Sequence, residues 1–137
     1  MTETKFSKAD LKARLTKEQY RVTQKAGTER PYTNEYHDKK DEGTYHCVVC
    51  NEPLFSSETK FDSGTGWPSF YAPVAKDAIT DHVDRKFFIS RVENVCSNCD
   101  AHLGHVFPEA NTPTHQRYCI NSASLKFVPA EAETEAD

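Results

Sequence analysis

The sequence predicts a mainly β protein with two short helices at its N-terminus, and two observations predict it. Apolar residues follow a helical spacing only before about Gly27. From about Thr44 onward, short runs rich in β-branched and aromatic residues alternate with turn-forming residues. With 137 residues, the chain fits one domain with a single modest core.

The two helices are predicted by capping signals. Ser7 followed by Asp10 is typical of a helix start, and Thr16 with Gln19 three residues later forms a capping box. The apolar anchors of this region are few, namely Leu11, Leu15, Tyr20 and Val22. We therefore expect the helices to pack as a flap on the β body and to take no part in the chemistry.

The β body is expected from three runs, TYHCVV, KFFISRV and RYCINSASLKFV. The tail after residue 128, PAEAETEAD, is acidic and has no large apolar side chain, so a core has nothing to hold there. We predict a flexible N-terminus at residues 1–5, a single domain at residues 6–128 and an acidic flexible tail at residues 129–137.

Composition narrows the functional classes. The formal net charge is −4 and no basic stripe is present, so nucleic acid is not an expected partner. Apolar runs stay short of the about 20 residues that a membrane span needs, and the N-terminus lacks the apolar segment of a signal peptide. We expect a soluble, cytoplasmic monomer. In such a chain, five cysteines indicate metal ligands or reactive thiols.

Four of the cysteines form two C-x-x-C pairs, Cys47 with Cys50 and Cys96 with Cys99. Each pair can bring two sulfurs to one tetrahedral ion, and two pairs complete the closed four-thiolate shell of a structural zinc site. Metal binding would add folding free energy to a small domain. A redox C-x-x-C, two disulfides or an iron site are the alternatives.

The fifth cysteine, Cys119, lies in the segment RYCINS. As a strand, this segment places Arg117, Cys119 and Asn121 on one face, with Tyr118 and Ile120 toward the core. A guanidinium beside a thiol favours the thiolate, which is the form that attacks. The alternative is a buried structural cysteine that packs as a small apolar residue.

Upstream motifs carry further candidates. His102 and His105 flank Gly104, where the backbone can turn tightly, so both rings could reach one pocket and supply an acid. A second metal at the two histidines is an alternative. Trp67, in the glycine-rich segment SGTGWPSF, could form a wall for a methyl-sulfur group, with core packing as the alternative.

Together, the two C-x-x-C pairs, SGTGWPSF, HLGHVFPE and RYCINSASLKF resemble the B-type peptide-methionine (R)-S-oxide reductases, from about Phe6 to Phe127. The resemblance implies twisted antiparallel sheets in a barrel-like, Mss4-like core with one structural zinc. It also implies reduction of methionine sulfoxide in oxidised proteins or peptides. Separate enzymes reduce the two epimers at sulfur, so selectivity for R comes with the family.

The resemblance assigns roles to individual residues. Cys119 would attack the sulfoxide sulfur and become a sulfenic acid, and His102 and His105 would position groups and supply the proton. Arg117 would favour the thiolate, and Asn121 would position substrate or water. The residues expected to bind substrate are Trp67, whose ring would hold the ε-methyl group, Phe70 and Glu109.

Two departures from the family pattern matter. Many members have a resolving cysteine where this chain has Thr65, which is either natural or an engineered replacement. We therefore predict a one-cysteine enzyme recycled by an external thiol, either thioredoxin or glutathione with glutaredoxin. Glu109 stands where many members have aspartate. The competing functions are a non-enzymatic zinc-binding interaction module and a peroxide-sensing thiol protein.

Overall fold

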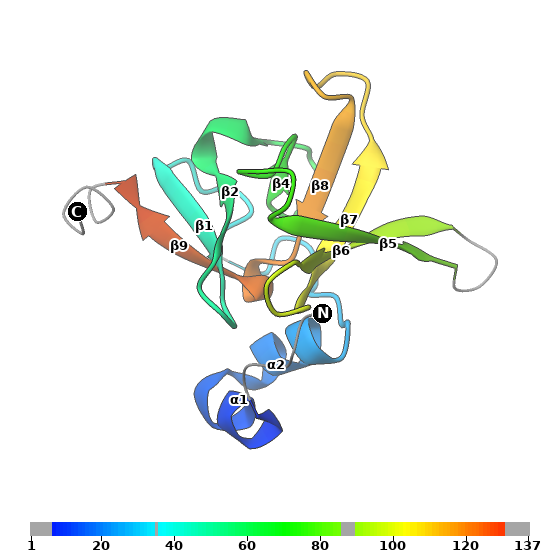
Figure 1. Ribbon diagram of the computed structural model, residues 1–137. Helices are drawn as coiled ribbons and strands as arrows, with labels where there is room; N and C mark the ends of the chain where they lie inside the picture. The colour runs from blue at the N-terminus through cyan, green and yellow to red at the C-terminus, as the bar shows by residue number, and fades with distance from the viewer. Residues whose placement is uncertain (1–6, 35, 86–89, 131–137) are drawn as a thin grey trace.

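The computed structural model describes residues 7–34, 36–85 and 90–130. Two short helices precede a body of antiparallel strands (Figure 1). The strands are β1 (Gly43–Cys47), β2 (Pro53–Ser56), β3 (Lys60–Phe61), β4 (Ser69–Phe70), β5 (Ile79–Asp84), β6 (Arg91–Cys96), β7 (His102–Pro108), β8 (Gln116–Ile120) and β9 (Leu125–Pro129). In the described residues, the 3-10 helices η1 (Ser57–Thr59) and η3 (Ser122–Ser124) connect β2 to β3 and β8 to β9, strands of different sheets.

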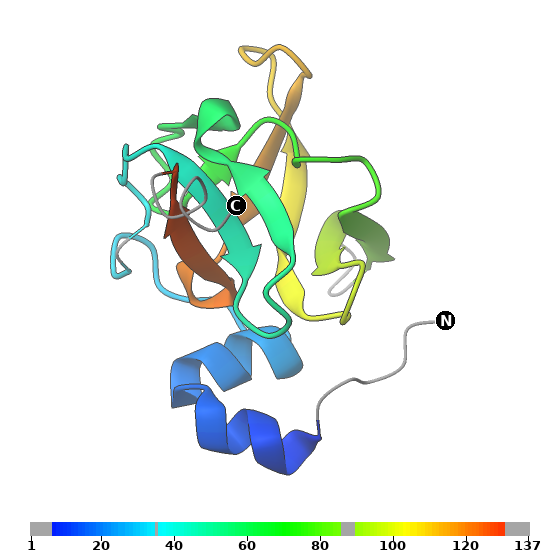
Figure 2. The ribbon, with the colours of Figure 1, turned by 60° about the vertical axis from the view of Figure 1, so that its left-hand side comes forward.

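The helices α1 (Lys8–Arg14) and α2 (Lys17–Gln24) begin where the sequence predicts. The Ser7 side chain accepts a hydrogen bond from the backbone N–H of Asp10, and Thr16 and Gln19 form a complete capping box. Both helices lie together at one end of the β body (Figure 2). Their buried apolar residues, Leu11, Leu15 and Val22, hold them there.

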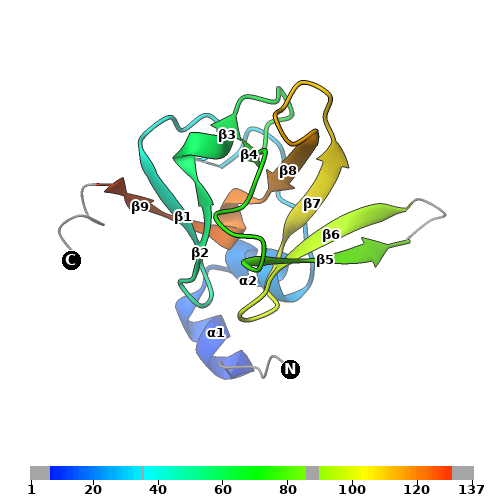
Figure 3. The same cartoon turned by 45° about the horizontal axis from the view of Figure 1, so that its top comes forward.

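The strands form two sheets. One has six strands in the order β3-β4-β8-β7-β6-β5, and the other has three in the order β2-β1-β9. Every strand pair is antiparallel. The hairpin of β5 and β6 extends away from the rest of its sheet (Figure 3). The predicted mainly β antiparallel fold is confirmed, although the two sheets stay separate and do not close into one continuous barrel.

Aromatic side chains fill the space between the two sheets. Tyr45 of β1 and Phe55 of β2, from the smaller sheet, meet Phe70 of β4 from the larger one. The rings of Phe55 and Phe70 are stacked with centroids 4.5 Å apart, and Tyr45 meets Phe70 edge-on at 5.2 Å. These pairs add attraction beyond the burial of their area, so they fix how the sheets sit against each other.

The ends of the domain differ slightly from the prediction. The predicted tail begins at Pro129, but Pro129 is the last residue of β9. The N–H of the next residue, Ala130, donates to the carbonyl of Glu42 at 3.0 Å. The rest of the predicted tail and the predicted N-terminal segment lie outside the described residues, as does part of the KFFISRV run. Among the described helices, none has the length and apolar character to cross a membrane.

Candidate active site

Cys119 lies in the interior of the six-stranded sheet, on β8 between β4 and β7. Its Cα partners across the sheet are Ser69 of β4 and His105 of β7. Tyr118 and Ile120 are buried, as the period-two alternation predicts, while Cys119 is partly exposed. The thiol therefore sits on a rigid support and faces away from the core.

A guanidinium contacts the sulfur of Cys119. Nη1 of Arg117 donates to Sγ at 2.8 Å, and Nε of Arg117 donates to Oε1 of Glu109 at 3.0 Å. The guanidinium also lies over the Phe107 ring, 4.9 Å from its centroid. These contacts hold the cation beside the sulfur.

Two hydroxyl groups also contact the sulfur, and a third hydroxyl connects them. Oγ1 of Thr65 and Oγ of Ser69 lie 3.8 Å and 3.7 Å from the Sγ of Cys119. Oγ of Ser63 contacts both of these hydroxyls at 2.7 Å. Thr65, singled out in the sequence as the replacement of a resolving cysteine, is therefore adjacent to the sulfur in space.

A small cavity of about 100 Å³ opens beside Cys119. Four residues selected from the sequence line it: Trp67, His105, Cys119 and Asn121. The other four lining residues are Thr28, Arg91, Gly104 and Phe107. The cavity has apolar rings, from Trp67 and Phe107, and polar groups, from His105 and Asn121. This lining suits a small ligand that has both a methyl and a polar end.

The two histidines meet, but only His105 lines the cavity. His102 is 4% exposed and lies behind it, with Nδ1 2.6 Å from Oε2 of Glu93. The two rings are edge-on with centroids 5.6 Å apart. A spacing of three would separate them on a regular strand, but the pairing with β6 shifts register between Asn94 and Val95. This bulge adds one residue to β7, so both rings come to one side.

Gly104 has a different role from the predicted turn, because the segment containing it is strand β7. A Cβ atom at this position would lie 2.0 Å from the carbonyl oxygen of Cys119. The missing side chain therefore lets β7 approach the backbone of Cys119 closely.

Two residues predicted to bind substrate do not line the cavity. Phe70 is fully buried and stacked on Phe55 in the core, because its position in β4 faces the smaller sheet. Phe107, two residues after His105 and on the same face of β7, provides a ring at the cavity instead. Glu109 pairs with Arg117 and contacts the site through that guanidinium.

The four remaining cysteines form a second cluster, as the sequence predicts. Their sulfurs lie within 4.8 Å of one another and can hold a metal ion. Cys47 and Cys99 have sulfurs 3.6 Å apart, as do Cys50 and Cys96. A regular tetrahedron with metal–sulfur bonds of about 2.3 Å requires about 3.8 Å between sulfurs. A disulfide bond is about 2.05 Å long, so sulfurs 3.6 Å apart fit a shared ion and not two disulfides.

The two C-x-x-C turns share a backbone conformation. Asn51 follows the first turn with φ 70°, and Asp100 follows the second with φ 65°. In each turn this residue donates its N–H to the carbonyl of the first cysteine at 2.8 Å. Asparagine and aspartate tolerate this left-handed conformation better than most residues. Both turns therefore present their sulfurs inward in the same way.

Hydrogen bonds among the four sulfurs shift the pKa values of the thiols in opposite directions. Contact with Cys50 raises the pKa of the Cys47 thiol, whereas contact with Cys47 lowers the pKa of the Cys50 thiol. The thiols thus compete for protons when they have only one another as partners. A shared cation would favour the thiolate at every position.

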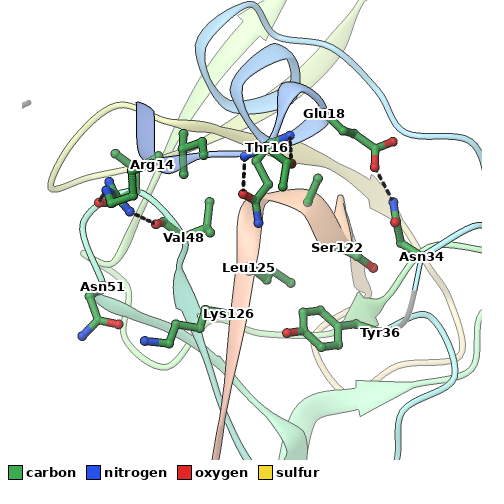
Figure 4. A pocket seen from close by; sticks show the side chains of 14 residues that line it. Arg14, Thr16, Glu18, Asn34, Tyr36, Val48, Asn51, Ser122, Leu125 and Lys126 are labelled. Carbon is green, nitrogen blue, oxygen red and sulfur yellow. Dashed lines mark hydrogen bonds between the residues drawn. The ribbon is translucent and has the colours of Figure 1, made fainter. Parts of the chain in front are cut away.

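A larger hollow, of about 580 Å³, lies between the helices and the three-stranded sheet (Figure 4). Arg14 borders it and donates to the carbonyls of Val48 and Val49 at 3.0 Å and 2.8 Å, which ties α1 to the first C-x-x-C turn. Neither cysteine nor histidine is among its described lining residues. The reactive groups gather at the smaller cavity.

Comparison with known proteins identifies the family. The SelR domain model matches residues 15–129. A "Peptide methionine sulfoxide reductase MsrB" of Hahella chejuensis is 53% identical over 137 residues, covering 100% of this chain and 99% of that protein. "Methionine-R-sulfoxide reductase B3, mitochondrial" of Mus musculus is 54% identical over 127 residues, covering 93% of this chain and 50% of that protein. The Escherichia coli MsrB is 51% identical over 127 residues. The chain belongs to the SelR-domain family of B-type peptide methionine sulfoxide reductases.

Proposed function

We propose that this protein reduces the R epimer of methionine sulfoxide to methionine, in repair of oxidised proteins or peptides, with Cys119 as the attacking thiolate. The observation that carries the proposal is the 2.8 Å contact between Nη1 of Arg117 and the Sγ of Cys119 beside a small, partly apolar cavity. The family relatives bear names of the same activity.

The reaction transfers one oxygen atom between two sulfurs. The Cys119 thiolate attacks the sulfoxide sulfur, and the sulfoxide oxygen takes up a proton because it is a poor leaving group. The oxygen then transfers to Sγ as the S–O bond of the substrate and the new S–S bond break, the methionine leaves as a thioether, and Cys119 becomes a sulfenic acid. The methionine sulfur is reduced by two electrons and the cysteine sulfur is oxidised by two.

His105 is the proposed source of the proton, because it lines the cavity opposite Cys119 on the neighbouring strand. His102 supports it from behind, and the contact of His102 with Glu93 fixes the orientation of its ring. Trp67 provides the surface for the methyl group, and Asn121 positions the polar end of the substrate.

Recycling requires an external thiol in this proposal. The four other cysteines would be bound to one zinc ion. Thr65, which stands where many family members have the resolving cysteine, has no thiol. Two external thiols would reduce the sulfenic acid to the thiol, with release of water and formation of a disulfide between them. Thioredoxin, or glutathione with glutaredoxin, are the expected reductants. The cytoplasmic location and the monomeric state also stay predictions.

A single-turnover experiment tests the mechanism. Without a reducing thiol, the protein should form one methionine per molecule and then stop, with Cys119 present as a sulfenic acid that dimedone traps. Mass spectrometry of the digested protein measures both products. A disulfide between Cys119 and another cysteine of the same chain would contradict the one-cysteine mechanism.

Thr65→Cys should convert the protein to a two-cysteine enzyme. The Thr65 hydroxyl lies 3.8 Å from Sγ of Cys119, and Gly64 and Gly66 on either side, both with positive φ, let the loop adjust. After one turnover this variant should contain an intramolecular disulfide and no dimedone adduct. Thr65→Ser is the matched control and should behave as the wild type; a persistent sulfenic acid in Thr65→Cys would contradict the assigned geometry.

Arg117→Met should lower kcat/KM for the R epimer by about 10²-fold, the typical loss on removal of one charged donor from a reacting atom. The variant keeps an unbranched side chain but removes the cation at 2.8 Å from Sγ. Arg117→Lys should lose less, because it keeps the charge without the fork that also binds Glu109. Equal activity of Arg117→Met and the wild type would rule out the thiolate role of Arg117.

A further inference from the structure

A buried carboxylate lies behind the candidate active site. Glu29 follows α2 and is 2% exposed. Its carboxylate accepts three hydrogen bonds of 2.8 Å, from the N–H groups of Ser122 and Ala123 and from Nδ2 of Asn34. Its two oxygens thereby bind the backbone that directly follows Asn121.

The backbone of the same residue holds two residues that line the cavity. The carbonyl of Glu29 accepts from Nε1 of Trp67 at 3.0 Å. Its N–H donates to Oδ1 of Asn121 at 2.9 Å, while Nδ2 of Asn121 donates to the carbonyl of Leu103 at 2.9 Å. The orientation of the indole ring and of the amide group therefore depends on where the backbone of Glu29 lies.

The side chain determines where that backbone lies. Residue 29 belongs to the connection between α2 and β1, and the described residues of this connection lie outside helices and strands. Two of its three carboxylate contacts attach it to η3 and the third attaches it to Asn34. The two backbone contacts attach it to Trp67 and Asn121. Five hydrogen bonds from one residue thus link three separate segments at the wall of the cavity.

Placing a carboxylate here is costly. Burial raises the pKa of Glu29, and the bonds from Ala123, Ser122 and Asn34 act in the opposite direction without cancelling the effect. An apolar side chain of similar size would fill the space without this penalty. The three polar contacts explain why a carboxylate stands at this position.

We propose that Glu29 is a positioning residue for substrate binding, which orients the Trp67 ring and the Asn121 amide at the cavity beside Cys119. This inference rests on the proposed reduction of a methyl sulfoxide, because it assigns those two groups to the substrate. It does not involve the thiolate, whose contacts with Arg117, Thr65 and Ser69 are separate from those of Glu29.

Glu29→Gln tests the proposal. The amide nitrogen of glutamine would face one of the two N–H donors of η3, so one contact is lost while the size of the side chain is kept. We expect KM for the R epimer to rise about tenfold with kcat within about threefold, because substrate binding is lost and the attacking group is not. The fluorescence of Trp67, the one tryptophan of the chain, should shift because its indole moves.

Two further measurements separate positioning from general stability. The rate of Cys119 alkylation by iodoacetamide and the zinc content should both stay within twofold of the wild type. Glu18→Gln is the matched control, since Glu18 is a neighbouring acid that accepts from Asn34 at 3.4 Å and does not line the cavity (Figure 4). It should leave KM and the fluorescence unchanged.

The outcomes are distinct. Unchanged KM and fluorescence in Glu29→Gln would overturn the proposal. If that variant does not fold, Asn34→Ala removes one of the three carboxylate contacts. Asn34→Ala should raise KM about threefold and shift the Trp67 fluorescence in the same direction by a smaller amount. Unchanged KM and fluorescence in Asn34→Ala would also overturn the proposal. If the wild type reduces no sulfoxide, the proposed function fails, and the proposal for substrate binding fails with it even if the fluorescence shift is found.

Discussion

Cys119→Ser should abolish reduction of the R epimer, with a loss on the order of 10⁴-fold or more. The serine hydroxyl is a far weaker nucleophile than a thiolate and cannot accept the sulfoxide oxygen as a sulfenic acid does. The neighbouring residues offer no substitute, because Thr65 and Ser69 at the sulfur carry only hydroxyl groups. Steady-state turnover with excess dithiothreitol measures the effect.

The same variant separates the proposed enzyme from its competitors. Zinc content and melting temperature should stay near those of the wild type, because Cys119 is partly exposed and is not part of the four-sulfur cluster. A variant that unfolds would indicate a structural cysteine. A variant that keeps full turnover would contradict the assignment of Cys119, and a wild type that oxidises with peroxide but reduces no sulfoxide would indicate a thiol sensor.

Removal of the metal should unfold the protein. Cys99→Ser takes one ligand from a cluster that joins the end of β1 to the end of β6, two elements in different sheets. A structural zinc ion contributes about 10–16 kcal/mol of binding free energy at neutral pH. That is as large as the whole stability of a typical domain, about 5–15 kcal/mol. We expect no cooperative thermal transition and no near-ultraviolet circular dichroism at 25 °C.

Two controls accompany this experiment. The wild type treated with a strong chelator should lose the same signals as zinc is released, and Cys119→Ser with intact metal should keep them. A Cys99→Ser protein that melts within a few degrees of the wild type would show that the four thiols do not hold a structural ion.

The sequence predicts the parts of this molecule that depend on local rules. The caps at Ser7 and Thr16 depend on residues three positions apart, so both helices begin where expected. The alternation around Cys119 follows from the geometry of one strand. Each C-x-x-C pair has a fixed internal spacing, so the sequence leaves open only whether the two pairs lie together in the folded chain.

The parts that were missed depend on contacts between distant segments. The bulge that brings His102 and His105 to one side arises from pairing with β6 and leaves no mark in the HLGH motif. Phe70 lies in the core, and Phe107 lines the cavity, because the second sheet covers β4 and not the cavity face of β7. Glu29 gives no signal in the sequence, since its contacts with Asn121, Ser122 and Ala123 span more than 90 residues.

The most direct test of the central claim is the consumption of the separated R and S epimers of a peptide-like methionine sulfoxide by the purified protein. Excess dithiothreitol serves as the reductant, so that the natural one need not be known. The proposed function predicts continuous turnover of the R epimer and none of the S epimer. Turnover of neither epimer by a folded protein with its zinc in place would contradict it.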